Sequence, residues 1–163
     1  MVGREDKKEN DLFFLCSLVE YMARKTKNHP SVVVSKLGEK NVEKIYDLAD
    51  VYHSDNIDDV SDDFIEKCKI DMGDFDNVRE CMYAVPSHWD MGKVYKRLVL
   101  YISTSENIEV IPAFRKLFSS RLIDKIENYN SDLYYQTEDT IMDFLPADER
   151  KLFPRCFFTE MTP

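Results

Sequence analysis

Leu12-Phe13-Phe14-Leu15-Cys16-Ser17-Leu18-Val19-Glu20-Tyr21-Met22 is the stretch that decides the fold class of this 163-residue chain. Its apolar residues recur at steps of three and four, which is the period of an amphipathic α-helix. The residues in this pattern are Leu12, Leu15, Cys16, Val19 and Met22. We expect Asn10 or Asp11 to cap the helix and a basic last turn near Lys27 to end it.

The sequence after this helix predicts more helices and no sheet. Pro30 suits the first turn of a short helix, and Gly38 suits its end. The run Val32 to Val34 could instead form a strand, but Pro30 and Gly38 bracket it and no partner strand is evident. The other expected helices span 41–52, 57–68, 94–102, 107–118, 122–129 and 137–145, and either Ser87 or Asp90 is expected to cap the one that contains 94–102.

A weak internal repeat suggests how these helices are organised. Leu18-Val19-x-Tyr21 recurs eighty residues later as Leu98-Val99-x-Tyr101, and Lys36-Leu37 recurs as Lys116-Leu117. Amphipathic helices can share such residues by chance, so a shared packing plan and coincidence both remain open. We predict an all-α fold of two similar multi-helix halves, 1–70 and 90–163, joined by an irregular linker at 71–89.

The composition argues against several classes of partner. The chain has 31 acidic and 22 basic residues, a formal net charge of −9, which is the wrong sign for binding nucleic acid or anionic lipid directly. No apolar run approaches the ~20 residues that span a bilayer. The charged residues 1–10 do not resemble a signal peptide, so we expect a cytoplasmic protein that does not bind membranes.

The cysteines and histidines do not form a recognisable metal or catalytic motif. Cys16, Cys68, Cys81 and Cys156 include no C-x-x-C pair and are interpreted as buried free thiols, although a zinc site assembled from distant positions stays open. His53 falls at the end of a predicted helix, where an imidazolium suits the helix dipole.

Catalytic motifs are also missing from the sequence. There is no G-x-S-x-G turn, and the four glycines are isolated, so a phosphate-binding loop is not expected. We predict a non-enzymatic protein without a cofactor, while a site assembled from distant residues remains an alternative.

Acidic residues are concentrated between Asp47 and Glu80, and this concentration is the main functional signal. The segment has twelve acidic and three basic residues, so its surplus of nine equals the net charge of the chain. Such a field attracts a basic protein partner, although a merely solvated face would look the same. The predicted partner-binding residues are Asp55, Asp58, Asp59, Asp62, Asp63, Asp71, Asp74 and Asp76.

Two further interpretations complete the functional hypotheses. An acidic protein can also mimic nucleic acid and inhibit a DNA- or RNA-binding enzyme, as an anti-restriction or anti-CRISPR protein does, and this is the alternative function. A tyrosine-rich stretch, Asn128 to Tyr135, combines turn-forming residues with aromatics. It is either an exposed recognition loop or a packed helical corner.

The first seventy residues resemble a family of small uncharacterised helical domains from gut-dwelling Gram-positive bacteria. The motifs that carry this resemblance are Phe14-x-Cys16, Val19-Glu20-Tyr21-Met22-Ala23, Val33 to Leu37, Tyr52-His53-Ser54 and Asp62-Asp63-Phe64-Ile65. The resemblance implies an accessory protein, sometimes encoded near ADP-ribosyltransferase-like toxins, and brings no catalytic residues. In the second half, Met91-Gly92-Lys93-Val94-Tyr95-x-Arg97-Leu98 and Asp124-Lys125-Ile126-x-x-Tyr129-Asn130-x-x-x-Tyr134-Tyr135 are similar to a motif of hypothetical proteins.

Overall fold

The computed structural model describes the backbone of residues 2–161 and the side chains of residues 8–157. Every regular element within these residues is a helix, so the predicted all-α fold is confirmed. The α-helices are α1 (Val2–Thr26), α2 (Pro30–Asp47), α3 (Ala49–His53), α4 (Ile57–Lys67), α5 (Asn77–Glu80), α6 (His88–Glu106), α7 (Val110–Ser119), α8 (Leu122–Ile126) and α9 (Glu138–Met142). Three 3₁₀-helices follow or interleave them: η1 (Leu133–Tyr135), η2 (Ala147–Leu152) and η3 (Pro154–Met161).

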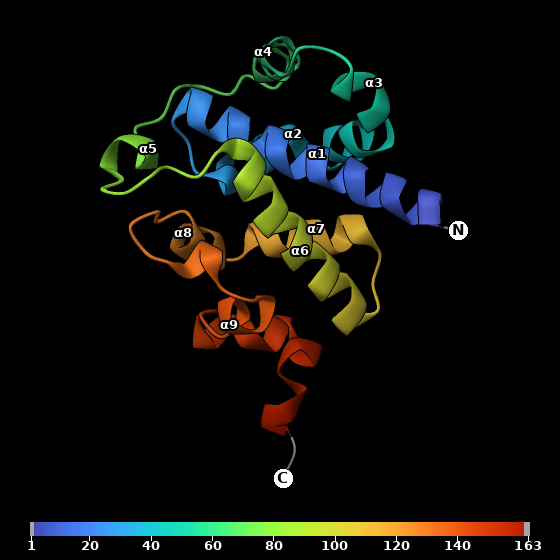
Figure 1. Ribbon diagram of the computed structural model, residues 1–163, viewed down its shortest axis with the longest axis vertical. Coiled ribbons are helices and arrows are strands. Elements are labelled where there is room, and N and C mark those ends of the chain that lie inside the picture. The colour runs from blue at the N-terminus through green and yellow to red at the C-terminus, as the bar shows by residue number, and fades with distance from the viewer. Residues whose placement is uncertain (1, 162–163) are drawn as a thin grey trace.

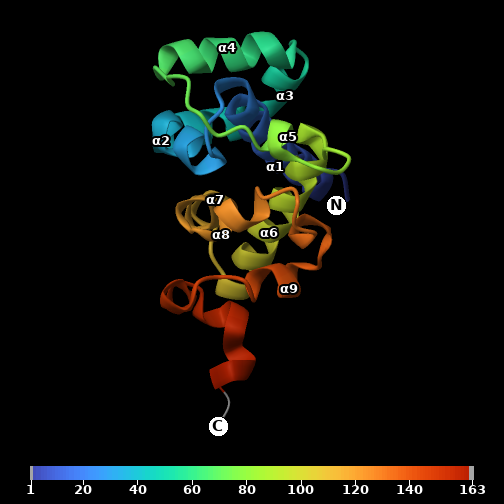
Figure 2. The same cartoon turned by 90° about the vertical axis from the view of Figure 1, so that its left-hand side faces the viewer.

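The helices lie in successive tiers along the long axis of the molecule. Figure 2 shows α4 at one end, α1 and α2 beneath it, then the group of α6, α7 and α8, and finally α9 with the C-terminal segment. Figure 1 shows α6 crossing α1 near the centre of the molecule. The first and second halves of the chain therefore meet through these two long helices.

A very close approach between Ser17 and Gly92 fixes the crossing of α1 and α6. A Cβ atom at Gly92 would lie 2.0 Å from Ser17 Oγ and 3.1 Å from Ser17 Cα. Only glycine lets the two backbones come this near, because any side chain would force them apart. The resulting core runs through both halves without a break and includes Leu18, Tyr95 and Phe118.

The first helix is longer than its sequence pattern predicts. The expected cap at Asn10 or Asp11 is wrong, because α1 begins at Val2 and both residues lie inside it. The residues before Leu12 include lysine, arginine and glutamate, which propagate a helix well without contributing to an apolar stripe. Periodicity therefore located the buried part of α1 and missed its polar extension.

Gly38 breaks the second helix as expected, and the chain is helical again directly after it. Its φ of 76° and ψ of 167° interrupt α2, and Val32 to Val34 are helical, so the strand alternative is wrong. Asn41 does not begin a separate helix. Its side-chain amide instead donates a 2.8 Å hydrogen bond to the Leu37 carbonyl, which ties the two parts of α2 across the kink.

Equivalent hydrogen bonds occur in the two halves of the chain. The Tyr21 hydroxyl donates to Asp58 at 2.7 Å, and the Tyr101 hydroxyl donates to Asp139 at 2.5 Å. Each bond joins a long helix, α1 or α6, to the first turn of a later helix of the same half, α4 or α9. The starts of α2 and α7, at residues 30 and 110, are also eighty positions apart. The two similar halves stay a prediction, which these correspondences motivate.

The segment predicted as a linker is partly structured. It contains the short helix α5 at Asn77–Glu80, and its last two residues, His88 and Trp89, already belong to α6. The start of α6 agrees with the sequence, because Ser87 caps it and forms a reciprocal capping box with Asp90.

Candidate functional site

The predicted acidic site is divided by the fold into two groups. One group lies on or beside α4, an amphipathic helix that buries Val60 and Phe64 and turns its acidic residues to solvent. Helical spacing turns the acidic residues of α4 away from its buried side. We call this set the acidic ridge; it comprises Asp55, Asp59, Asp62, Asp63 and the additional Glu66, all exposed.

Asp58 lies on the inner flank of α4, where cations and hydroxyls of α1 compensate it. Its carboxylate accepts hydrogen bonds from Lys25 and Tyr21, and Lys25 also forms a 2.6 Å ion pair with Asp62. The hydrogen bond from Lys25, followed by the one from Tyr21, lowers the pKa of Asp58. Asp58 and Asp62 therefore help to hold α4 on α1, and the other ridge carboxylates carry the outward charge.

The second group follows the chain between α4 and α5. This segment runs past the end of α1, where the Gly73 amide donates to the Thr26 carbonyl at 2.8 Å. Asp71 and Asp74 are exposed there, whereas Asp76 caps α5 and pairs with Lys27 at 3.7 Å. Asp71, Asp74 and Asp76 thus belong to a different element from the ridge.

A small groove runs beside the ridge between α4 and the end of α2. It has a volume of about 220 Å³, and Asp55 and Asp63 line it together with the apolar Val60 and Phe64. Lys67 already places its ammonium 5.8 Å from the centre of the Phe64 ring. The groove therefore combines carboxylates with an aromatic face that accepts a cation.

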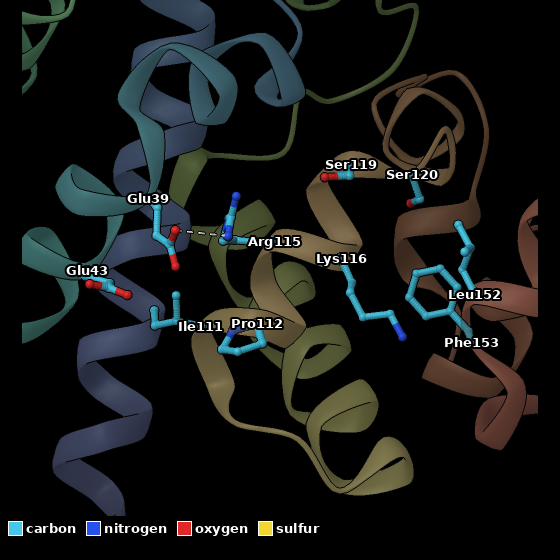
Figure 3. A pocket seen from close by; sticks show the side chains of 10 residues that line it. All are labelled: Glu39, Glu43, Ile111, Pro112, Arg115, Lys116, Ser119, Ser120, Leu152 and Phe153. Atoms are coloured by element: carbon cyan, nitrogen blue, oxygen red, sulfur yellow. Dashed lines mark ion pairs between the residues drawn. The ribbon is translucent and has the colours of Figure 1, made fainter.

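A larger pocket lies on the outer side of α7 and is shown in Figure 3. It has a volume of about 410 Å³ and lies between α2 and the C-terminal segment. Its charged groups are largely compensated within the pocket. Arg115 pairs with Glu39 at 3.4 Å, and the Lys116 ammonium lies 4.8 Å from the centre of the Phe153 ring.

A buried polar cluster joins α1 to α8 and is the most unusual electrostatic feature of the interior. Glu20 and Glu127 are 0% and 1% exposed. Arg24 donates to Glu20 at 3.2 Å and to the Tyr129 hydroxyl at 2.9 Å, and that hydroxyl donates to Glu20. The Tyr95 hydroxyl donates to Glu127. Two buried carboxyl groups thus belong to one hydrogen-bonded cluster with a single guanidinium, which pairs with Glu20.

Glu127 is the carboxyl group that keeps its proton. Burial, followed by the charge of Glu20 and the hydrogen bond between the two carboxyl groups, holds the pKa of Glu127 well above its usual range. Glu20 Oε1 accepts no hydrogen bond from an amide, guanidinium or hydroxyl of the described residues. A proton on Glu127 supplies the missing donor to Glu20, so the pair carries one negative charge opposite Arg24.

Sequence patterns did not identify this cluster. Glu20 lies between Val19 and Met22 on the apolar stripe of α1, and that position was the available signal. Arg24 is one turn away, but Tyr129 and Glu127 are more than a hundred residues away, so only the fold brings them to Glu20. Because both carboxyl groups are closed to solvent, the cluster stabilises the interior and does not offer a reactive surface.

The histidines contact aromatic rings. His53 lies edge-on to Phe14 with ring centres 5.6 Å apart, and His88 packs against Tyr21 at 5.0 Å. Burial, followed by the charge of Arg24, lowers the pKa of His88. Within the described part of the chain, no three His, Cys, Asp or Glu side chains gather in a way that could hold a metal ion.

The four cysteines are free, but they differ from the prediction that all would be buried. Cys16 is buried, whereas Cys68, Cys81 and Cys156 are partly exposed. Burial raises the pKa of the Cys16 thiol far above its ordinary value, so this thiol is unreactive.

The tyrosine-rich stretch combines both roles that the sequence left open. Tyr129 and Tyr134 are buried, and Tyr129 belongs to the carboxyl cluster, whereas Tyr135 is 75% exposed. One end of this stretch therefore packs a corner of the fold, and the other presents an aromatic ring to solvent.

Comparison of the chain with protein-family models, curated proteins and solved structures finds no match. The resemblance of the first seventy residues to a bacterial helical domain family therefore stays a prediction. Among the described residues, no helix combines the length and the apolar character needed to cross a membrane.

Proposed function

We propose that this chain is a non-enzymatic interaction module that binds a basic protein segment along the acidic ridge of α4. The observation that carries this proposal is the outward placement of the ridge carboxylates. Asp55, Asp59, Asp63 and Glu66 are exposed and have no ion-pair partner among the described residues. They place four uncompensated carboxylates of the acidic segment on or directly before one helix.

The groove beside the ridge supports a specific way of binding. An arginine or lysine of the partner can lay its aliphatic stem on the partly exposed Tyr52, which also lines the groove, while its charged head reaches Asp55 and Asp63. Lys67 also lines the groove, over the Phe64 ring, so the partner would compete with this internal cation. The long-range field would accelerate association and would fade over a Debye length of about 8 to 10 Å.

The test compares two variants with the same change in charge. The ridge variant, Asp59→Asn with Asp63→Asn, removes two negative charges from the ridge. The loop variant, Asp71→Asn with Asp74→Asn, removes two from the loop between α4 and α5. We expect the ridge variant to lose capture of basic proteins from a native lysate of the source cell at low salt, and the loop variant to keep it. Equal losses would show that bulk charge, and not the ridge, drives binding.

The alternative function, nucleic-acid mimicry, makes a separate prediction for the same ridge. A mimic occupies the cationic groove of its target, so the wild-type chain should displace DNA or RNA from the captured partner. A partner that binds the chain and its nucleic acid simultaneously would exclude mimicry and leave the interaction module in place.

A further inference from the structure

A groove with the opposite chemistry from the ridge lies between α6 and the loop before it. It has a volume of about 540 Å³, and Val85, Pro86 and Tyr135 contribute apolar surface to it. Lys93, Lys96 and Arg97 line the α6 side of this hollow. We call it the tyrosine–lysine groove. Met82 and Tyr83 precede it in the chain and are 76% and 65% exposed.

Hydrogen bonds hold this exposed aromatic surface in place. The Met82 amide donates to the Asn130 side chain at 2.7 Å, and the Asn130 amide group donates to the Glu80 carbonyl at 3.1 Å. The loop beside α5 is thus fixed to the tyrosine-rich stretch. A surface that is ordered before binding loses less entropy on association than a mobile one does.

The groove carries surplus positive charge within an acidic protein. Lys96 and Arg97 have only long ion pairs, at 3.9 Å to Glu9 and 3.5 Å to Glu138. Lys93 has no ion-pair partner within residues 8–157. The single carboxylate that lines the groove, Asp90, accepts a 2.9 Å hydrogen bond from the Ser87 amide in the capping box.

The chain itself contains a surface that complements this groove. At the junction of α2 and α3, Leu48 and Val51 are 42% and 57% exposed, and Asp47 and Asp50 flank them. We call these four residues the acidic corner. The Val51 amide donates to the Leu48 carbonyl at 3.0 Å, so a single turn brings these two apolar residues together, and Asp47 and Asp50 each precede one of them in the chain. Lys93 and Arg97, one turn apart on α6, present a matching row of cations.

We propose that the chain assembles head to tail, with the tyrosine–lysine groove of one copy holding the acidic corner of a second copy. Leu48 and Val51 would cover Tyr135 and Val85, and the corner carboxylates would face the α6 cations. No residue of the corner lines the groove, and Figure 1 shows α3 and α5 on different sides of the molecule. Because the contact joins two different surfaces, it leaves one of each free and can repeat.

This assembly is independent of the proposed function of the ridge. It uses Asp47 and Asp50 at the corner, whereas the ridge variant changes Asp59 and Asp63. Loss of partner capture and loss of self-assembly can therefore be observed separately.

A charge-swap experiment on the full chain tests the assembly. The groove variant is Lys93→Glu with Arg97→Glu, and the corner variant is Asp47→Lys with Asp50→Lys. Each variant alone has like charges on both surfaces and should stay monomeric by analytical ultracentrifugation. Mixed together, the intact groove of one variant should bind the intact corner of the other, and the acidic groove should likewise bind the basic corner, so the mixture should associate although neither variant does alone.

The wild-type chain and an aromatic truncation provide the second measurement. The average mass of the wild type should rise with protein concentration and return to the monomer at about 1 M salt, where the screening length is about 3 Å. Tyr135→Ala should weaken association about tenfold. Phe144 is also an exposed aromatic residue but does not line the groove, so Phe144→Ala should leave association unchanged.

Three results would overturn the proposal. These are a wild-type mass that does not change with concentration, a mixture of folded variants that stays monomeric, and dimers formed by either variant alone. The last result would indicate a symmetric interface elsewhere on the surface. Helical circular dichroism of both variants establishes that they are folded.

Discussion

Lys27 and Asn107, eighty residues apart, adopt the same rare backbone conformation, with φ values of 56° and 54°. Each follows the last residue of a long helix, α1 or α6, and reverses the chain toward the helix that begins three residues later. Left-handed backbone at this position commonly ends a helix, and glycine adopts it with the least strain. The two halves thus stop their long helices in the same way with different residues.

The strain at these positions predicts a stabilising substitution. Lys27→Gly should increase the free energy of unfolding by about 1 kcal/mol, because a lysine pays a steric penalty in this region that glycine avoids. Asn107→Gly should gain less, since asparagine tolerates the conformation better. Urea denaturation measures both, and a decrease for Lys27→Gly would mean that its exposed pair with Asp76 matters more than the strain.

Glu127→Gln should flatten the dependence of stability on pH. The folded pKa of Glu127 is raised, so its contribution is complete below the unfolded value of 4.5 and is lost as pH rises toward the folded pKa. Above about pH 6.5 and up to the folded pKa of Glu127, wild-type stability should fall by up to about 1.4 kcal/mol per pH unit from this group. His88, whose pKa is lowered, acts in the opposite sense and only at lower pH.

The control for this measurement is Glu109→Gln, an exposed glutamate at the start of α7. It should leave the slope of unfolding free energy against pH as it is in the wild type. Parallel slopes for Glu127→Gln and the wild type would contradict a proton on Glu127.

Glu20→Gln should destabilise the protein more than Glu127→Gln does. Glu20 is the carboxylate that faces Arg24, so its replacement leaves a half-buried guanidinium without a counter-charge. Breaking a buried pair from one side costs about 3–5 kcal/mol, whereas glutamine can replace a protonated glutamate as a hydrogen-bonding group. Equal losses in chemical denaturation would show that the two carboxyl groups share the charge evenly.

Two buried serines should respond in opposite directions to substitution by alanine. Ser17 Oγ, at the α1–α6 crossing, has no hydrogen-bond partner among the described residues, and Ser61 Oγ donates to the Asp58 carbonyl at 2.7 Å. Ser17→Ala should raise the unfolding free energy or leave it unchanged, and Ser61→Ala should lower it by about 1 kcal/mol. Thermal unfolding of the two variants side by side checks the difference.

The substitution Gly92→Ala tests the crossing of α1 and α6 from the α6 side. The added methyl group would overlap Ser17, whose Cα would be 3.1 Å away, so α1 and α6 must separate. Overpacking of this kind costs about 1–3 kcal/mol. Ser17→Gly in the same chain should recover part of the loss, and no recovery would place the strain elsewhere.

Local patterns predicted much of the fold, because amphipathic helices show their period within a few turns. The helix at 57–68 and the cap at Ser87 were found in this way and agree with α4 and α6. The start of α1 was missed because its first turns are polar. Periodicity reports which residues are buried, and it contains no information on a helix that extends into solvent.

The candidate sites show the same difference between features that are local in the sequence and features that are not. The carboxylates of α4 were predicted because they are close together in sequence, although Asp71, Asp74 and Asp76 were grouped with them and lie on another element. The Glu20–Glu127 pair and the tyrosine–lysine groove were not predicted. Both are assembled from residues that are distant in sequence, so their chemistry exists only in the folded chain.

The pairing of Glu20 with Arg24 and Tyr129 also affects when the protein can form during synthesis. Until residue 106 has left the ribosome, α1 lacks the α6 surface that buries its apolar face, and until residue 129 has left it, Glu20 lacks its tyrosine partner. We therefore expect the nascent first half to remain dependent on chaperones, and the chain to acquire its native structure in a single late step. Deleting the second half should yield an insoluble fragment and not a smaller folded protein.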